Sequence, residues 1–112
     1  MEEVRAFYEK VVGLKVGERP PFRSFGYWLY AEGRDVLHLS EQMPEDQRRR
    51  GSDLTFDHVA FESSNRKLHV QDLLAAGVKF TEEVVPTSGR RQIFFRDPAG
   101  NGVELIFPAS EA

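Results

Sequence analysis

An internal repeat constrains this chain of 112 residues more than any other feature. In each half the sequence predicts a helix that ends at a glycine, then a strand, a connection and a β-hairpin. The two hairpins align without a gap at an offset of 66 residues, which places Trp28 on Phe94 and His38 on Glu104. A fold with this repeat is built from two similar modules of helix and sheet.

The first half opens with apolar residues at helical spacing: Val4, Phe7, Tyr8, Val11 and Val12. Gly13 is expected to end this helix, because a residue without Cβ adopts the left-handed cap conformation at little cost. Two aromatic and β-rich runs, 27–30 and 36–39, then predict a hairpin around a turn at 32–35.

The second half repeats this order after an additional strand. We expect a helix from about Asn65 to Ala76, capped by Ser64 or Asn65, with His69 in solvent. Its buried face is predicted to contain Val70, Leu73 and Leu74. The strands are predicted at 56–61, 78–85, 91–96 and 102–107, with turns at 86–89 and 97–101.

We therefore expect a single α+β domain with a polar connection between its modules. The connection contains Arg48, Arg49 and Arg50, which we interpret as part of a solvated loop. The predicted boundaries are 1–41 for the first module, 42–54 for the linker and 55–108 for the second module.

The second module begins with a strand that contains His58, and the first module has no equivalent. At the same offset that strand would lie upstream of Met1. We therefore expect the first module to lack its first strand, which leaves an unpaired sheet edge and favours a homodimer.

Composition excludes several classes of function. A formal net charge of −3 argues against nucleic-acid or membrane-surface binding through a broad basic face. The absence of cysteine excludes disulfides, thiolate metal sites and a thiol nucleophile. The sequence has neither an apolar signal region nor an apolar run of membrane-spanning length, so a cytoplasmic protein with small-molecule partners is expected.

Three strands each place one polar side chain among small or apolar neighbours: His38, His58 and Glu104. The apolar residues on both faces of these strands suggest that one face is covered by helices and the other lines a cavity. Two imidazoles and a carboxylate suit a divalent ion such as Zn, Mn, Fe, Co or Ni.

Glu104 also has a purely structural explanation. A carboxylate between two apolar neighbours is costly to bury unless it is paired or bound to a metal. A salt bridge to Arg91, Arg96 or His58 would satisfy it. Trp28, Tyr30 and Phe94 likewise form either an aromatic wall for a ligand or part of the core.

Four motifs carry a family resemblance: Phe7-Tyr8 with Val12-Gly13-Leu14, then 36–39, 57–61 and 96–105. With them the chain resembles the vicinal oxygen chelate superfamily, also described as the glyoxalase, bleomycin-resistance and extradiol-dioxygenase group. The resemblance implies two βαβββ modules with curved mixed sheets that form a cleft, the first module here without its first strand.

The resemblance also implies a site. His38, His58 and Glu104 correspond to metal ligands, with Glu104 the catalytic candidate, and Trp28, Tyr30, Gln92 and Phe94 are the substrate-binding candidates. In such enzymes the metal chelates two adjacent substrate oxygens and stabilises an enolate, an alkoxide or bound dioxygen, in lyase, isomerase or dioxygenase reactions.

Two other functions remain open at this point. One is a metal-free protein of the bleomycin-resistance type, which would sequester an aromatic or cationic drug with help from the acidic charge balance. The other is a degenerate domain that serves only in assembly.

Overall fold

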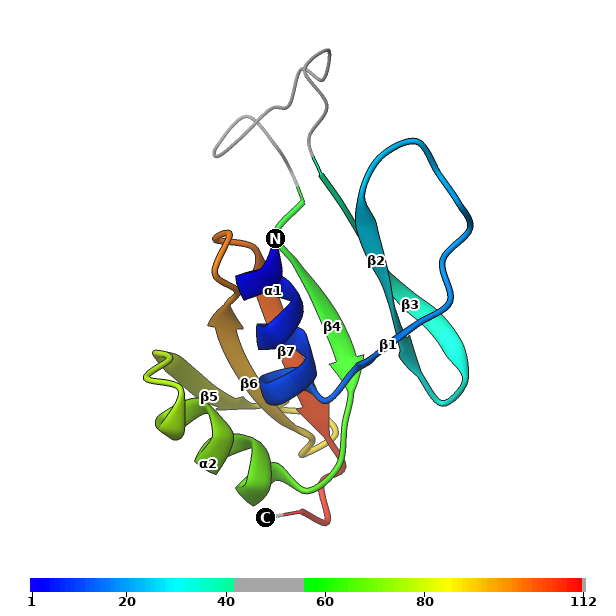
Figure 1. The fold of residues 1–112 in the computed structure, drawn as a ribbon. Helices are drawn as coiled ribbons and strands as arrows, with labels where there is room; N and C mark the ends of the chain where they lie inside the picture. The colour runs from blue at the N-terminus through cyan, green and yellow to red at the C-terminus, as the bar shows by residue number, and fades with distance from the viewer. Residues whose placement is uncertain (42–55, 112) are drawn as a thin grey trace. The chain divides into compact units, whose positions relative to one another are not determined.

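A computed structural model of the chain describes residues 1–41 and 56–111. The chain divides into two compact units, Met1–Thr55 and Phe56–Ala112, and each contains its own sheet (Figure 1). The α+β class is confirmed. The predicted linker at 42–54, with its three arginines, lies outside the described residues. No helix of the described ranges combines the length and apolarity that a membrane span requires.

The first unit begins with a helix that changes its winding. The α-helix α1 (Glu2–Phe7) continues into the π-helical turn η1 (Tyr8–Val12). Gly13 then takes a left-handed φ of 90°, and the amides of residues 13 and 14 both donate to the carbonyl of Tyr8. The predicted end at Gly13 is confirmed. The buried side chains all lie in η1: Tyr8, Val11 and Val12.

The sheet of the first unit is antiparallel, with strand order β1-β2-β3. Its strands are β1 (Lys15–Gly17), β2 (Gly26–Ala31) and β3 (Arg34–Ser40). Glu32 and Gly33, with φ of 52° and 78°, form the two-residue turn between β2 and β3, which is the geometry that suits the twist of a hairpin. A bulge leaves Val36 without a partner on β2.

The second unit has the strand order β4-β7-β6-β5, with β4 parallel to β7 and the other pairs antiparallel. Its elements are β4 (His58–Glu62), α2 (Arg66–Ala75), β5 (Phe80–Val84), β6 (Arg91–Arg96) and β7 (Gly102–Phe107). β7 therefore has a neighbour on each side. Both of its faces are covered, since every residue except Ile106 is buried.

The strand register confirms the repeat. Trp28 pairs with His38 across β2 and β3, and Phe94 pairs with Glu104 across β6 and β7. β1, β2 and β3 thus correspond to β5, β6 and β7. Within the described residues β3 pairs only with β2, whereas β7 also pairs with β4.

Two predictions for α2 are wrong. Leu74 is 65% exposed, while its neighbour Leu73 is fully buried. His69 is half-buried rather than solvated, and its ring lies 5.7 Å from that of Phe107 on β7. The apolar stripe of this helix is therefore narrower than its sequence pattern indicates.

The predicted side-chain cap of α2 is also wrong. Asn65 occupies the cap position in the left-handed region, with φ of 60°, and neither it nor Ser64 makes a side-chain cap bond. The amide of Arg66 instead donates to Glu111 Oε1 at 2.9 Å. A carboxylate close to the C-terminus therefore performs the capping.

The adjacent leucines of α2 provide a matched test of the core. Leu73→Ala removes a fully buried side chain and is expected to lower the free energy of unfolding by about 2–5 kcal/mol. Leu74→Ala removes an exposed one, so its effect should stay within about 0.5 kcal/mol. Urea denaturation of both variants checks this, and equal losses would contradict the burial of Leu73.

Candidate functional site

His58 begins β4 at a point where two strands come unusually close together. It lies opposite Gly102 on β7. A Cβ at position 102 would lie 2.5 Å from the carbonyl oxygen of Asp57 and 2.8 Å from the Cβ of His58. Only glycine leaves room for this approach, and the imidazole extends from there toward Glu104, two residues further along β7.

Glu104 is a buried carboxylate with a partner for each oxygen. The residue is 6% exposed. Its Oε1 lies 2.8 Å from Nε2 of His58, and its Oε2 accepts a hydrogen bond of 3.1 Å from Nε2 of Gln92. Of the salt bridges left open by the sequence, the described residues contain the one to His58. Arg96 donates instead to the carbonyl of Gly100.

Asp57 holds the other nitrogen of the same imidazole. Its Oδ2 lies 2.7 Å from Nδ1 of His58. This hydrogen bond is the largest cause that raises the pKa of His58 above its usual value; burial opposes the shift, and the hydrogen bond and charge of Glu104 add to it. The imidazolium is thus stabilised between two carboxylates.

Phe94 completes the surroundings of His58. It faces Glu104 across β6 and β7, and its ring meets the imidazole edge-on at 5.6 Å and 89°. Two predicted substrate-binding residues, Gln92 and Phe94, therefore lie directly beside two predicted metal ligands. Asp57, which sequence reasoning did not select, could have been noticed because it immediately precedes His58.

The pair formed by His58 and Glu104 fits part of a metal centre. Metal–nitrogen and metal–oxygen bonds of about 2.0–2.2 Å separate two neighbouring donor atoms by roughly 3 Å in octahedral coordination and by roughly 3.4 Å in the tetrahedral coordination of zinc. Nε2 and Oε1 are 2.8 Å apart. A carboxylate on the far nitrogen, as Asp57 provides, is the usual support of a metal-bound histidine.

A complete metal centre would need ligands in addition to His58 and Glu104. Within residues 1–41 and 56–111, no group of three or more such side chains is arranged to hold a metal ion. The pair thus offers two ligands. His38, the third ligand predicted from the sequence, belongs to the first unit.

His38 has surroundings of a different kind. Its ring stacks on the indole of Trp28, with centroids 3.9 Å apart and planes 5° from parallel. Asp35 is hydrogen-bonded to its Nε2, which holds the pKa of the Asp35 carboxyl below its usual range. The side chain of His38 is 48% exposed and Val36 is 44% exposed. The face of β3 that carries Val36, His38 and Ser40, which the sequence predicts to line a cavity, is therefore the exposed face of this strand.

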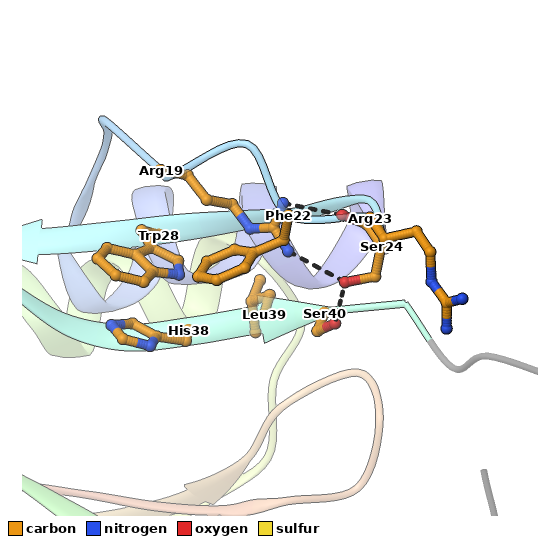
Figure 2. A pocket seen from close by; sticks show the side chains of 8 residues that line it. All are labelled: Arg19, Phe22, Arg23, Ser24, Trp28, His38, Leu39 and Ser40. Carbon is orange, nitrogen blue, oxygen red and sulfur yellow. Dashed lines mark hydrogen bonds between the residues drawn. The ribbon is translucent and has the colours of Figure 1, made fainter.

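A pocket of about 440 Å³ lies against the first sheet, entirely within the first unit (Figure 2). Its walls contain Phe22, Trp28, His38 and Leu39, and its polar groups belong to Arg19, Arg23, Ser24 and Ser40. Of the three aromatic residues that the sequence offers as a ligand wall, Trp28 lines this pocket, Phe94 belongs to the second unit, and Tyr30 is not among the lining residues. Its hydroxyl donates to the carbonyl of Glu18 at 2.7 Å.

Sequence reasoning missed most residues of this pocket. The segment that carries Arg19 and Phe22 contains Pro20 and Pro21, which by themselves predict a connection or a sheet edge. A signal was present nonetheless, because two arginines and two phenylalanines within seven residues are unusual for an ordinary solvated loop.

The comparison with protein-family models identifies one family. The family model of the Glyoxalase/Bleomycin resistance protein/Dioxygenase superfamily matches residues 1–105. A comparison with curated proteins finds no match.

Three solved structures illustrate the likeness of fold. A glyoxylase/bleomycin resistance protein/dioxygenase domain from Frankia sp. has a TM-score of 0.77 at 16% identity, over 100% of this chain and 86% of that one. TnmS3, an antibiotic binding protein from Streptomyces sp., has a TM-score of 0.71 at 24% identity over 96% and 85%. Lactoylglutathione lyase from Agrobacterium tumefaciens has a TM-score of 0.64 at 21% identity over 99% and 87%.

The hydrogen bond from Asp57 leads to a prediction about the pKa of His58. Asp57→Asn removes the main cause of its upward shift, so the pKa should fall toward the usual value. Because the pKa of His58 is raised in the folded state, protonation of His58 increases the free energy of unfolding at low pH, and this contribution is lost as the pH rises through the folded-state pKa. Asp57→Asn should reduce this contribution. NMR titration of the histidine ring protons checks this, with Asp35→Asn as the control that should leave His58 unchanged.

Proposed function

The chain belongs to the glyoxalase/bleomycin resistance protein/dioxygenase superfamily, and from that premise we propose that it binds a divalent metal ion through His58 and Glu104 and acts on a small molecule with adjacent oxygen atoms. The observation that carries the proposal is the buried carboxylate of Glu104, hydrogen-bonded to an imidazole that a second carboxylate orients. Lyase, isomerase and dioxygenase reactions are the classes that this chemistry serves.

The donor set supports a metal better than a purely structural ion pair. A buried ion pair is weak as a stabilising device, because desolvation offsets most of its Coulomb energy. The imidazole nitrogen and the carboxylate oxygen suit a transition-metal cation, which would take the place of the proton they share. A bound cation supplies Lewis acidity that stabilises negative charge on a substrate oxygen.

The neighbouring side chains have definable tasks in this proposal. Asp57 keeps a proton on Nδ1 of His58, so that Nε2 is the nitrogen that would bind a cation held between His58 and Glu104. Gln92 restrains Oε2 of that carboxylate and leaves Oε1 as the donor. Phe94 packs against the imidazole with the two rings nearly perpendicular, which restrains the orientation of His58. We also propose His38 as a third ligand, as the sequence predicts.

A second function is favoured by a different observation. The first unit contains a pocket with aromatic walls that uses neither His58 nor Glu104. Metal-free binding of a small molecule would need nothing more, and the likeness of fold to an antibiotic binding protein supports this alternative.

Metal titration of the chelator-treated protein tests the first proposal. Calorimetry with Mn²⁺, Co²⁺, Ni²⁺ and Zn²⁺ should detect binding, with proton release that depends on the buffer because His58 must give up its proton. His58→Ala and Glu104→Gln should each weaken binding at least tenfold, and Asp57→Asn by about tenfold. His38→Ala tests the third proposed ligand.

Glu62→Gln and His69→Ala are the matched controls. Glu62 lies on β4 with a side chain 90% exposed, and His69 lies on α2, so both should keep wild-type affinity. Wild-type protein that binds none of the four ions, or binding that survives in both site variants, would contradict the proposal. Ligand binding undiminished by chelator would then favour the metal-free function.

A further inference from the structure

We propose that the pocket on the first sheet binds a small organic anion with a flat, apolar body, such as an aromatic carboxylate. The pocket lies within one unit, between the segment that precedes β2 and the strands β2 and β3 (Figure 2). Its volume of about 440 Å³ is in the range of small-molecule sites and exceeds what an isolated inorganic ion requires.

The guanidinium of Arg19 provides the positive charge. Its Nη1 donates to the carbonyl of Ser24 at 2.9 Å, and its Nη2 donates to the hydroxyl of the same residue at 3.3 Å. Both partners are neutral, and in the described part of the chain no carboxylate forms an ion pair with this arginine. Its buried Nε also has no acceptor there. A cation held in this way is stabilised by an anion in the pocket.

The lining of the pocket has the opposite charge balance from the whole protein. The chain carries a net charge of −3, yet among residues 1–41 and 56–111 neither aspartate nor glutamate lines this pocket, whereas two arginines do. The carboxylate of Glu41, which follows Ser40, accepts a hydrogen bond of 2.8 Å from the amide of Phe25. A cationic ligand would therefore meet repulsion here, which opposes the expectation that acidic balance attracts a cationic drug.

Two serine hydroxyls add hydrogen-bonding capacity beside the arginine. Oγ of Ser24 and Oγ of Ser40 are 3.2 Å apart, and the first of these also accepts from Arg19. A hydroxyl has one proton and can rotate to donate or accept, so the hydrogen-bonded pair can present one donor to a carboxylate oxygen. The polar end of the pocket is thus a guanidinium beside one adjustable hydroxyl donor.

The aromatic wall beside Arg19 selects the body of the ligand. The rings of Phe22 and Trp28 lie 6.0 Å apart at an angle of 40°, and Leu39 adds aliphatic surface. Arg19 lies over the ring of Phe22, with 5.0 Å between the guanidinium carbon and the ring centroid. Phe22 is 52% exposed, so an apolar ligand has surface to cover. An anionic group at Arg19 and a flat apolar body against these rings satisfy both ends together.

Three ligands of similar shape and different charge test this inference. 2-Naphthoate, 2-naphthamide and 2-naphthamidine differ in charge but hardly in size. Trp28 is the single tryptophan of the chain, so its indole N–H resonance reports on the pocket in ¹H–¹⁵N spectra. We expect 2-naphthoate to shift that resonance and to bind at least tenfold more tightly than 2-naphthamidine, with 2-naphthamide between them.

Variants separate the role of Arg19 from general electrostatics. Arg19→Gln should weaken 2-naphthoate at least tenfold while changing 2-naphthamide by less than twofold. Arg34→Gln removes the same charge from an exposed position on β3 and should leave both affinities within twofold. If Arg19→Gln fails to fold, the charge series on the wild type still decides.

Tighter binding of the amidine, equal effects of Arg19→Gln and Arg34→Gln, or no binding of any of the three compounds would overturn the inference. All titrations are made in chelator and repeated in His58→Ala. Binding that persists there supports the anion site even where the metal proposal fails, so the two can fail independently.

Discussion

The second unit is organised around one buried carboxylate. Glu104 lies on β7, whose backbone is paired on both sides, so neighbouring strands are the source of partners for its side chain. β4 supplies His58 and β6 supplies Gln92. A shift of either strand by one residue would turn its polar side chain to the other face and leave a buried charge without a partner. The identity of Gly102 follows from the same constraint, since any side chain there would separate β4 from β7.

The two modules use equivalent positions for different purposes. His38 and Glu104 occupy the same place in the repeated hairpin, opposite Trp28 and Phe94. Glu104 is enclosed because β4 continues the sheet beyond β7, whereas His38 is half exposed and rests on an indole. The second unit thereby places the imidazole of His58 between the carboxylates of Asp57 and Glu104. The first unit concentrates arginines and aromatic rings beside its sheet, which favours a ligand of opposite charge.

The sequence predicted most of the fold, because the relevant signals are local. The last hairpin has its predicted limits, 91–96 and 102–107, and Gly13 ends the first helix as expected. The failures depend on contacts between distant residues. His69 is half-buried against Phe107, and the cap of α2 comes from Glu111 rather than from the helix's own flanking side chains. No pattern within the helix contains that information.

For the site, the sequence by itself determined which chemistry was available. The chain has no cysteine and therefore no thiolate, and its strand pattern and internal repeat indicated His38, His58 and Glu104 as candidate ligands. The tertiary structure decided that His58, rather than Arg91 or Arg96, pairs with Glu104. Strand order and register set the distances between these side chains, and spacing along the chain does not. It also decided that Arg19 and Phe22 share a pocket with Trp28, since a proline-containing connection has no periodicity from which its side-chain directions follow.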